Sequence, residues 1–233
     1  MNHVSTASVM AAERPRSEEK LLDCKAESSL THIQYAVDYL ASRDAAMASL
    51  ARKAHLDNYI TGLTPFESLV HAVIYQQLSG RAARSVHLKL LSLFGGKYPA
   101  PHELISTPDD RLRGTGISAR KVQYLKEIAK AANEGKLERS HLANLPDEKI
   151  IELLDDIRGV GTWTIDMLLI FVLGRPDVFP ASDLGLRKAI ARLYKMERIP
   201  SEREAEEFAK RWAPYRSVAS LMLWHSFDKS PWQ

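Results

Sequence analysis

Apolar residues recur three and four positions apart along most of the chain, which is the spacing of helices that bury one face. One such face comprises Phe66, Leu69, Val70, Val73 and Ile74. No segment shows a convincing alternation of apolar and polar residues, as a half-buried strand would. The pattern therefore predicts an all-α fold. The other segments with helical spacing are 33–40, 47–54, 82–94, 118–133, 147–157, 205–212 and 217–227.

Polar residues mark where several of these helices begin. Thr64 precedes Pro65, and Glu67 follows three positions after Thr64, which is the pattern of a capping box with proline in the first turn. Ser201 and Glu204 have the same spacing before segment 205–212. Thr107, before Pro108, predicts a third start capped by a side chain.

A short segment with two glycines separates two of the predicted helices. Gly159 and Gly161 lie between the amphipathic segment 147–157 and the almost entirely apolar segment 163–173. Such glycines allow a tight reversal of the chain and a close approach of another molecule to the backbone. The second helix is expected to begin at about Thr162, with its first N–H groups unpaired at the positive end of the helix dipole. This arrangement favours a bound anion such as a phosphodiester, although an ordinary two-helix corner has the same pattern.

Composition narrows the class of protein. The 233 residues are 45% hydrophobic and 26% charged, which is typical of a soluble globular protein. The net charge of +3 is spread along the chain and points only weakly to a polyanionic partner. The single cysteine, Cys24, excludes a disulfide framework and a four-cysteine metal or iron–sulfur site within the chain, and favours a reducing, cytoplasmic location. The longest apolar run, 167–173, is too short to span a membrane, and no histidine pair has the spacing of a zinc site.

Several motifs in this order resemble one family. The first is Leu153-x-x-x-Ile157-x-Gly159-Val160-Gly161-x-Trp163-Thr164, followed by Pro180-x-x-Asp183-Leu184. The chain thus resembles the helix–hairpin–helix DNA glycosylase superfamily, and within it the short all-helical form of the 3-methyladenine DNA glycosylase II group. Together the similar blocks cover roughly residues 64–225. The others are Phe66-Glu67-x-Leu69-Val70-x-Ala72-x-x-x-Gln76-Gln77-Leu78-Ser79, Gly116-Ile117-Ser118-x-x-Lys121 and Trp212-x-Pro214-Tyr215-Arg216-Ser217-x-Ala219.

The resemblance implies two helical lobes that flank a DNA-binding cleft. Residues 28–62 and 176–233 would form the first lobe, and residues 63–175 the helix–hairpin–helix lobe. Residues 1–27 carry no signal peptide and are expected to form a flexible tail.

Asp183 is the candidate catalytic residue. From its position before Leu184 it is expected to be a helix N-cap. The resemblance implies a second role, in which the carboxylate lies beside a nucleotide flipped out of the duplex. There it would stabilise the positive charge that develops on the deoxyribose as the C1′–N bond breaks, and would activate the attacking water. The two roles are compatible, because a cap anchors the carboxylate.

Two aromatic residues are expected in the base pocket. Trp163 stands where bifunctional members of the superfamily have a lysine that forms a Schiff base, so the resemblance implies hydrolysis that leaves an intact abasic strand. Tyr215 aligns with another pocket aromatic, and packing in the core is the alternative for both residues. An aromatic face suits a cationic alkylated purine, with a gain of ~1–2 kcal/mol when the contact is desolvated.

DNA contacts are expected from the hairpin, from a loop and from basic side chains. The loop after the first capped helix matches the family's wedge, and Gln77, Leu78 and Ser79 are equal candidates to enter the duplex. A solvated surface is the alternative for each basic residue. The resemblance leaves open a monovalent cation held by hairpin carbonyls, and no other cofactor or metal is expected. The predicted contacts are Gly159, Val160, Gly161, Thr162, Thr164, Gln77, Leu78, Ser79, Arg81, Arg84, Arg120 and Lys121.

The leading hypothesis is a monomeric, monofunctional DNA N-glycosylase of base excision repair. Its substrate would be double-stranded DNA containing alkylated purines of the 3-methyladenine and 7-methylguanine type. It would act at the nucleoid in a bacterium or in the nucleus of a eukaryote. A non-enzymatic helix–hairpin–helix binding module is one alternative and would not need Asp183. An oxidised-base or mismatch glycosylase with lyase action is another, disfavoured by Trp163 and by the single cysteine.

Overall fold

The computed structural model describes residues 32–52, 56 and 59–226, and in these ranges the chain is helical with no β-strand. The prediction of an all-α fold is confirmed. A first helix occupies residues 32–43. The helices that follow are α2 (Ala45–Ala51), α3 (Pro65–Tyr75), α4 (Gly80–Leu93), α5 (Pro101–Ser106), α6 (Asp109–Gly114), α7 (Ala119–Asn133), α8 (Arg139–Ala143), α9 (Asp147–Asp155), α10 (Thr162–Phe171), α11 (Leu184–Leu193), α12 (Glu202–Ala209), the 3₁₀ turn η1 (Lys210–Trp212) and α13 (Arg216–His225).

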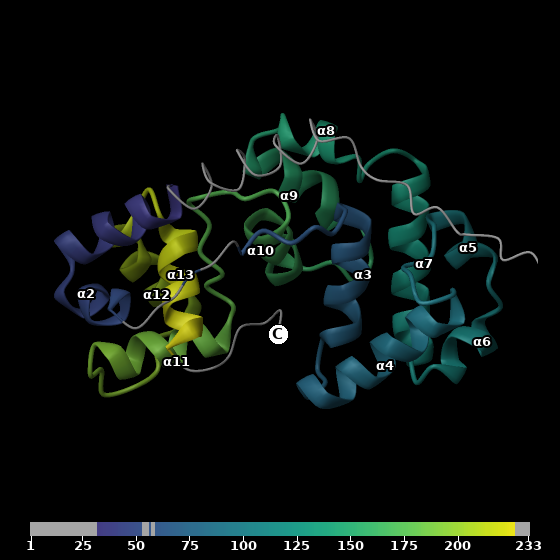
Figure 1. Ribbon diagram of the computed structural model, residues 1–233, viewed down its shortest axis with the longest axis horizontal. Helices are drawn as coiled ribbons and strands as arrows, with labels where there is room; N and C mark the ends of the chain where they lie inside the picture. Colours follow the sequence, from purple (N-terminus) through teal and green to yellow (C-terminus); the bar gives the residue numbers. More distant parts are fainter. Residues whose placement is uncertain (1–31, 53–55, 57–58, 227–233) are drawn as a thin grey trace, which may run out of the picture.

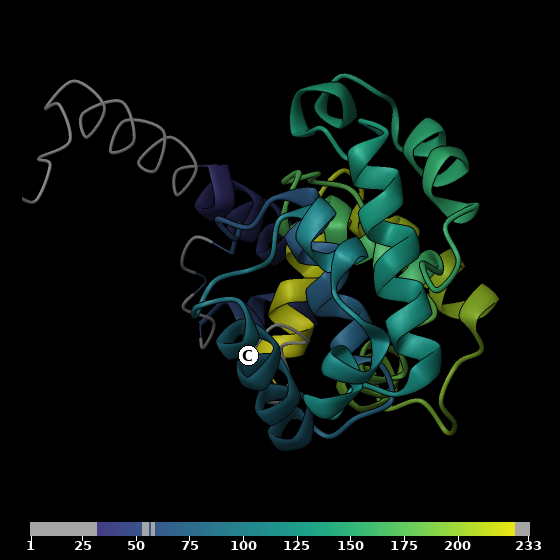
Figure 2. The ribbon, with the colours of Figure 1, turned by 90° about the vertical axis from the view of Figure 1, so that its right-hand side faces the viewer.

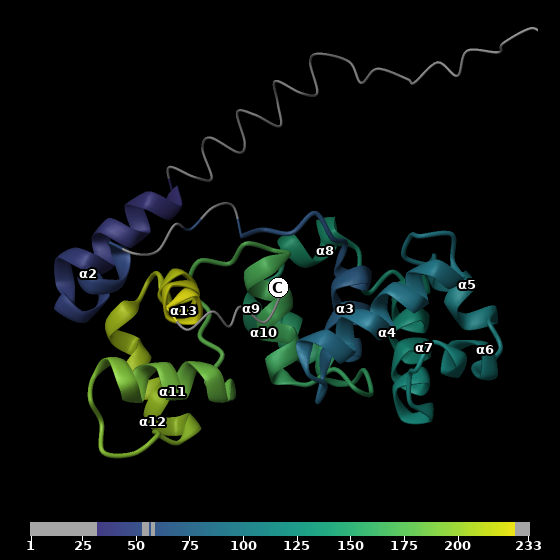
Figure 3. The same cartoon turned by 60° about the horizontal axis from the view of Figure 1, so that its bottom comes forward.

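The helices form two groups that meet around α10 (Figure 1). In the first group α13 packs against α2 and α11, and α12 packs against α11. In the second, α7 packs against α3, α5 and α6, and α4 packs against α3. Figure 2, turned by 90°, places the teal helices of the second group nearest the viewer. Helix α10 packs against α3 and α9, and the segment between α10 and α11 leads into the first group (Figure 3).

Helix α10 is central because it is apolar on every side. All its residues from 164 to 171 are buried, and they belong to the core that also includes Leu69 of α3 and Leu186 of α11. A helix without a polar face is most stable when other helices bury it on all sides. Asp166 is the only charged residue in α10, and it is buried like its neighbours.

Two of the three predicted helix starts are confirmed, and one is wrong. Thr64 and Glu67 form the reciprocal capping box, in which the Thr64 N–H donates to Glu67 Oε2 over 2.7 Å, and Ser201 and Glu204 form another. Thr107 does not cap α6. Its hydroxyl instead donates to the Glu103 carbonyl at the end of α5, and α6 begins after Pro108 without a side-chain cap.

The predicted tail, residues 1–27, lies outside the described residues. The lobe boundaries at 62/63 and 175/176 stay a prediction. None of the helices in the described part of the chain is both long and apolar enough to cross a membrane.

Candidate DNA-binding and catalytic site

The two hairpin glycines have different structural roles. Gly159 has a φ of +94°, and a Cβ there would lie 2.3 Å from the Tyr124 ring, so both the turn and the packing require glycine. Gly161 has an ordinary φ of −105°, is exposed, and has open space where a Cβ would be. Helix α10 starts directly after it, at Thr162, as predicted. Gly159 therefore makes the turn, and Gly161 leaves the start of α10 accessible.

Only part of the predicted hairpin surface is available to another molecule. Gly161 and Thr162 are exposed, whereas Val160 and Thr164 are buried. The Thr164 N–H donates to the Gly161 carbonyl over 2.8 Å, and its hydroxyl oxygen accepts a hydrogen bond from another side chain. The side chains of Val160 and Thr164 are therefore turned into the protein, and their contact with DNA stays a prediction. The role of Thr164 here is to hold the hairpin.

The donor to Thr164 is Gln76, which joins the hairpin to the end of α3. Gln76 Nε2 donates to the Gly159 carbonyl and to Thr164 Oγ1, both over 3.2 Å. Lys121 Nζ donates to the carbonyls of Ile74 (2.8 Å) and Gln76 (2.7 Å). Burial, and to a lesser extent the charge of Arg120, lowers the pKa of Lys121. The bonds of Gln76 and Lys121 fix the loop after α3 relative to the hairpin. Lys121 was predicted to contact phosphate, and two of its three N–H groups are already engaged in these bonds.

The predicted wedge loop is exposed at the tip between α3 and α4. Gln77 has a left-handed φ of +57°, and Leu78 keeps 42% of its surface exposed. Ser79 is the N-cap of α4, where its hydroxyl accepts the Ala82 N–H over 3.4 Å. The remaining basic candidates, Arg81 and Arg84 on α4 and Arg120 on α7, have exposed side chains.

Asp183 and Trp163 are in direct contact. Asp183 is the N-cap of α11, with Oδ1 accepting the Leu186 N–H over 2.8 Å. Its other oxygen, Oδ2, accepts the Trp163 indole N–H over 2.9 Å. Both side chains are half-buried. Each carboxylate oxygen thus has one donor, from the starts of two different helices, and this orients the carboxylate.

Gly185 is a site residue that the sequence did not reveal. A Cβ at this position would lie 2.9 Å from Asp183 Oδ1, with no other atom as near. A larger residue would therefore push against the carboxylate itself rather than against the core. The available signal was the position of Gly185 two residues after Asp183.

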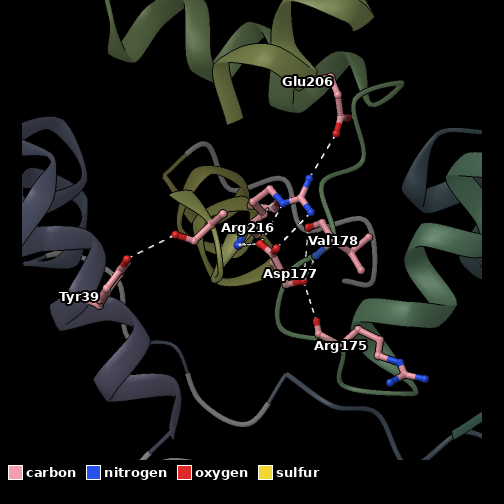
Figure 4. A network of polar contacts seen from close by, with 9 residues as sticks. Tyr39, Arg175, Asp177, Val178, Glu206 and Arg216 are labelled. Atoms are coloured by element: carbon pink, nitrogen blue, oxygen red, sulfur yellow. Dashed lines mark hydrogen bonds and ion pairs between the residues drawn. The ribbon is translucent and has the colours of Figure 1, made fainter. Parts of the chain in front are cut away.

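The segment from α10 to Asp183 is held by α13 through a polar network (Figure 4). Arg216 pairs with Asp177 through Nε (2.8 Å) and Nη2 (3.1 Å), and its Nη1 donates to Glu206 of α12 over 3.3 Å. The Ser217 hydroxyl donates to the Arg175 carbonyl (2.7 Å) and accepts the Val178 N–H (2.9 Å). The paired charges are only half-buried, but together with the Ser217 bonds they fix the course of the chain toward Asp183. The sequence motif that contains Arg216 and Ser217 does not by itself predict this role.

Tyr215 lies in different surroundings from those of Trp163. It packs edge-on against Tyr39, with ring centroids 5.0 Å apart, and lines a cavity of about 460 Å³ together with Tyr35 and Tyr59. Neither Trp163 nor Asp183 lines that cavity. The structure thus brings Trp163 and Asp183 together and places Tyr215 against the first helix. A role for Tyr215 in the base pocket stays a prediction.

The family model described as "HhH-GPD superfamily base excision DNA repair protein" matches residues 70–214, which include the hairpin, Trp163 and Asp183. The chain belongs to this superfamily. Within the HhH-GPD superfamily, DNA-3-methyladenine glycosylase 1 of Schizosaccharomyces pombe is 38% identical over 162 residues, which are 69% of this chain and 71% of that protein. The putative DNA-3-methyladenine glycosylase YfjP of Bacillus subtilis is 30% identical over 84% of this chain and 70% of its own length.

A solved structure of the same superfamily agrees with the fold. The S. pombe 3-methyladenine DNA glycosylase Mag1, in complex with abasic DNA, superposes with a TM-score of 0.78 and 31% identity. The match covers 85% of this chain and 99% of Mag1. Among the described residues, no group of three or more histidine, cysteine, aspartate or glutamate side chains could hold a metal ion. The monovalent cation at the hairpin stays a prediction, and one of the carbonyls there, that of Gly159, already accepts the bond from Gln76.

Proposed function

We propose that this member of the superfamily is a monofunctional DNA N-glycosylase that hydrolytically excises alkylated purines. The observation that carries the proposal is the contact between Trp163 and Asp183, where the hairpin helix meets the start of α11. The relatives named for 3-methyladenine supply the substrate class, and Mag1 bound to abasic DNA supports DNA as the partner. We propose that the DNA is double-stranded. We also propose that the protein acts as a monomer.

In the proposed reaction, the bond between C1′ and the purine nitrogen breaks as water attacks C1′. The Asp183 carboxylate faces the sugar, stabilises the developing positive charge, and accepts the proton that the water loses. The purine leaves with the bonding electron pair. A methylated purine already carries a positive charge, so it departs as a neutral base without prior protonation. Trp163 has no amine that could attack C1′, so no Schiff base forms and the strand stays intact.

The exposed backbone at Gly161 and Thr162 supports a phosphate site at the start of α10. For the wedge we favour Leu78 over its neighbours. Ser79 is engaged in capping α4, and Gln77 is in the left-handed turn, whereas Leu78 presents an apolar side chain to solvent at the tip. An exposed leucine has an apolar surface to bury, and the gap left by a flipped base provides the place.

The test is release of free bases from DNA methylated with a simple methylating agent, followed by chromatography. We expect 3-methyladenine and 7-methylguanine in solution, and strands that break only when the abasic sites are cleaved by heat or alkali. Borohydride should trap no protein–DNA adduct. Strand scission by the enzyme together with a trapped adduct would contradict the hydrolytic reaction, and DNA binding without any base release would indicate a binding module instead.

A further inference from the structure

An acidic cavity lies beside α10, and its lining includes Thr162 and Ser182, the residues directly before Trp163 and Asp183, but neither Trp163 nor Asp183 themselves. Its volume is about 430 Å³, it is open to solvent, and it is lined by the start of α9, one face of α10, the segment 177–182 and α12. Only one basic side chain, that of Arg216, lines it among the described residues. Six carboxylates line it, those of Asp147, Glu148, Asp166, Asp177, Glu202 and Glu206.

Two polar groups in this cavity have no partner in the described part of the chain. Asp166 is only 7% exposed, lines the cavity, and makes no hydrogen bond or ion pair. The hydroxyl of Ser182 is buried and also lacks a hydrogen-bond partner. Burial raises the pKa of Asp166 to about 7, and the neighbouring charge of Glu206 adds to this effect. Ser182 Oγ is cut off from solvent, whereas the Asp166 carboxylate faces the open cavity, so a ligand that enters the cavity would supply a partner to both groups.

The charges around the cavity are only partly balanced. Arg175 pairs with Asp147 over 3.0 Å, Arg187 lies 3.8 Å from Glu202, and Arg216 pairs with both Asp177 and Glu206. Six carboxylates therefore face three guanidinium groups. The excess negative charge favours a cationic ligand.

The shape and lining of the cavity restrict the kind of cation. No three carboxylates in the described chain converge on a point that could hold a metal ion, so the negative groups are distributed along the wall. Between them the wall is apolar, with the side chains of Ile151, Leu169, Val178 and Phe179. Separated carboxylates with apolar surface between them match a ligand in which ammonium groups are joined by methylene chains.

We propose that this cavity binds a linear aliphatic polyamine, with one ammonium group donating to Asp166 and Ser182 and a second reaching the carboxylates of α9 or α12. Thr162 and Ser182 bring the cavity close to the hairpin and to Asp183, but neither Trp163 nor Asp183 lines it, so polyamine binding can be measured without glycosylase activity. It supplies the buried Asp166 carboxylate with the partner that the protein itself does not provide.

The test is isothermal titration calorimetry of spermidine into the full chain without DNA, at pH 8 and constant ionic strength. We expect saturable binding of one spermidine per chain. Asp166→Asn keeps the shape of the side chain and should weaken binding at least about tenfold, because one charge-assisted hydrogen bond is lost. Asp155→Asn is the matched control, since Asp155 is an exposed carboxylate of α9 outside the cavity, and it should bind spermidine as the wild type does.

Each other outcome would overturn the proposal. Absence of saturable heat, or equal weakening by Asp166→Asn and Asp155→Asn, would mean that spermidine only screens surface charge. Displacement of spermidine by magnesium chloride at the same ionic strength would likewise mean that spermidine only screens surface charge. Binding of a lysine-rich peptide but not of spermidine would assign the cavity to a protein partner. Circular dichroism of both variants verifies that a loss of binding does not reflect unfolding.

Discussion

The polar groups at the start of α10 and Asp166, one turn further along, differ in how they are satisfied. Trp163 donates to Asp183, and Thr164 accepts from Gln76, so both side chains are held by a defined partner. Asp166 is buried among carboxylates without a partner in the described part of the chain. The contact between Trp163 and Asp183 has the fixed geometry that catalysis requires, because a group held in place needs no reorganisation during the reaction. The acidic cavity at Asp166 has an unbalanced charge, which suits ligand binding and reduces stability.

The largest effect among the positioning residues is expected for Gly185→Ala. The new Cβ would press on Asp183 Oδ1, from which it would be 2.9 Å away, and would turn the carboxylate from its two donors. We expect the single-turnover rate of base release to fall about 10²-fold, which is the range for a misplaced catalytic group. The melting temperature should change little, since alanine favours the helix. Gly114→Ala, where a Cβ meets nothing within 4 Å, is the control and should keep full activity.

The stability of Asp166→Asn tests whether the Asp166 carboxylate lacks a partner in the folded protein. Burial raises the Asp166 pKa from its ordinary 3.8 to about 7, so the folded protein binds this proton more tightly than the unfolded chain does. The contribution of Asp166 to the free energy of unfolding therefore falls as pH rises from about 4 to about 7 and is constant above that. Without polyamine, Asp166→Asn should be more stable than the wild type by up to ~4 kcal/mol at pH 8 and nearly equal to it at pH 4. Urea unfolding at both pH values measures this, and a gain that does not depend on pH would contradict it.

Trp163→Phe removes the indole N–H but keeps an aromatic ring. Asp183 then loses one of its two hydrogen bonds, and the maximal rate should fall about tenfold, corresponding to ~1.4 kcal/mol. Affinity for abasic DNA should stay within about twofold. A loss of affinity with an unchanged rate would mean that Trp163 binds DNA or base without orienting the carboxylate.

Gln76→Ala weakens the junction between the hairpin and α3. Loss of its bonds to Gly159 and Thr164 should lower the free energy of unfolding by ~1 kcal/mol. DNA affinity should also fall, because the wedge loop and the hairpin would no longer be held in register. Gln123→Ala, on the surface of α7, is a control whose DNA affinity should match that of the wild type.

Structural features that depend on residues close together in the chain can be predicted from the sequence, whereas contacts between distant residues cannot. The capping boxes at Thr64 and Ser201 and the start of α10 involve residues within one turn of one another, and they are confirmed. The predicted helix cap at Thr107 is wrong for a local reason too, since a threonine hydroxyl can form a hydrogen bond either with the helix before it or with the one after it.

The contact between Trp163 and Asp183 joins residues 20 positions apart, and that between Arg216 and Asp177 joins residues 39 apart. No spacing rule predicts either contact, because both depend on how helices pack. Asp166 could have been found. A single carboxylate inside an apolar segment such as 163–173 is unusual, and its burial follows from the residues around it.

The most direct test of the account compares Asp183→Asn with Asp166→Asn in one assay. Both replace a carboxylate with the amide of the same shape, and asparagine still caps α11 at position 183. The measurement is the single-turnover rate of 7-methylguanine release from a defined duplex, with enzyme in excess and affinity for abasic DNA measured in parallel. The account predicts that Asp183→Asn loses at least about 10³-fold in rate while keeping its affinity, and that Asp166→Asn releases the base as fast as the wild type. Full activity of Asp183→Asn, or an equal loss in both variants, would contradict it.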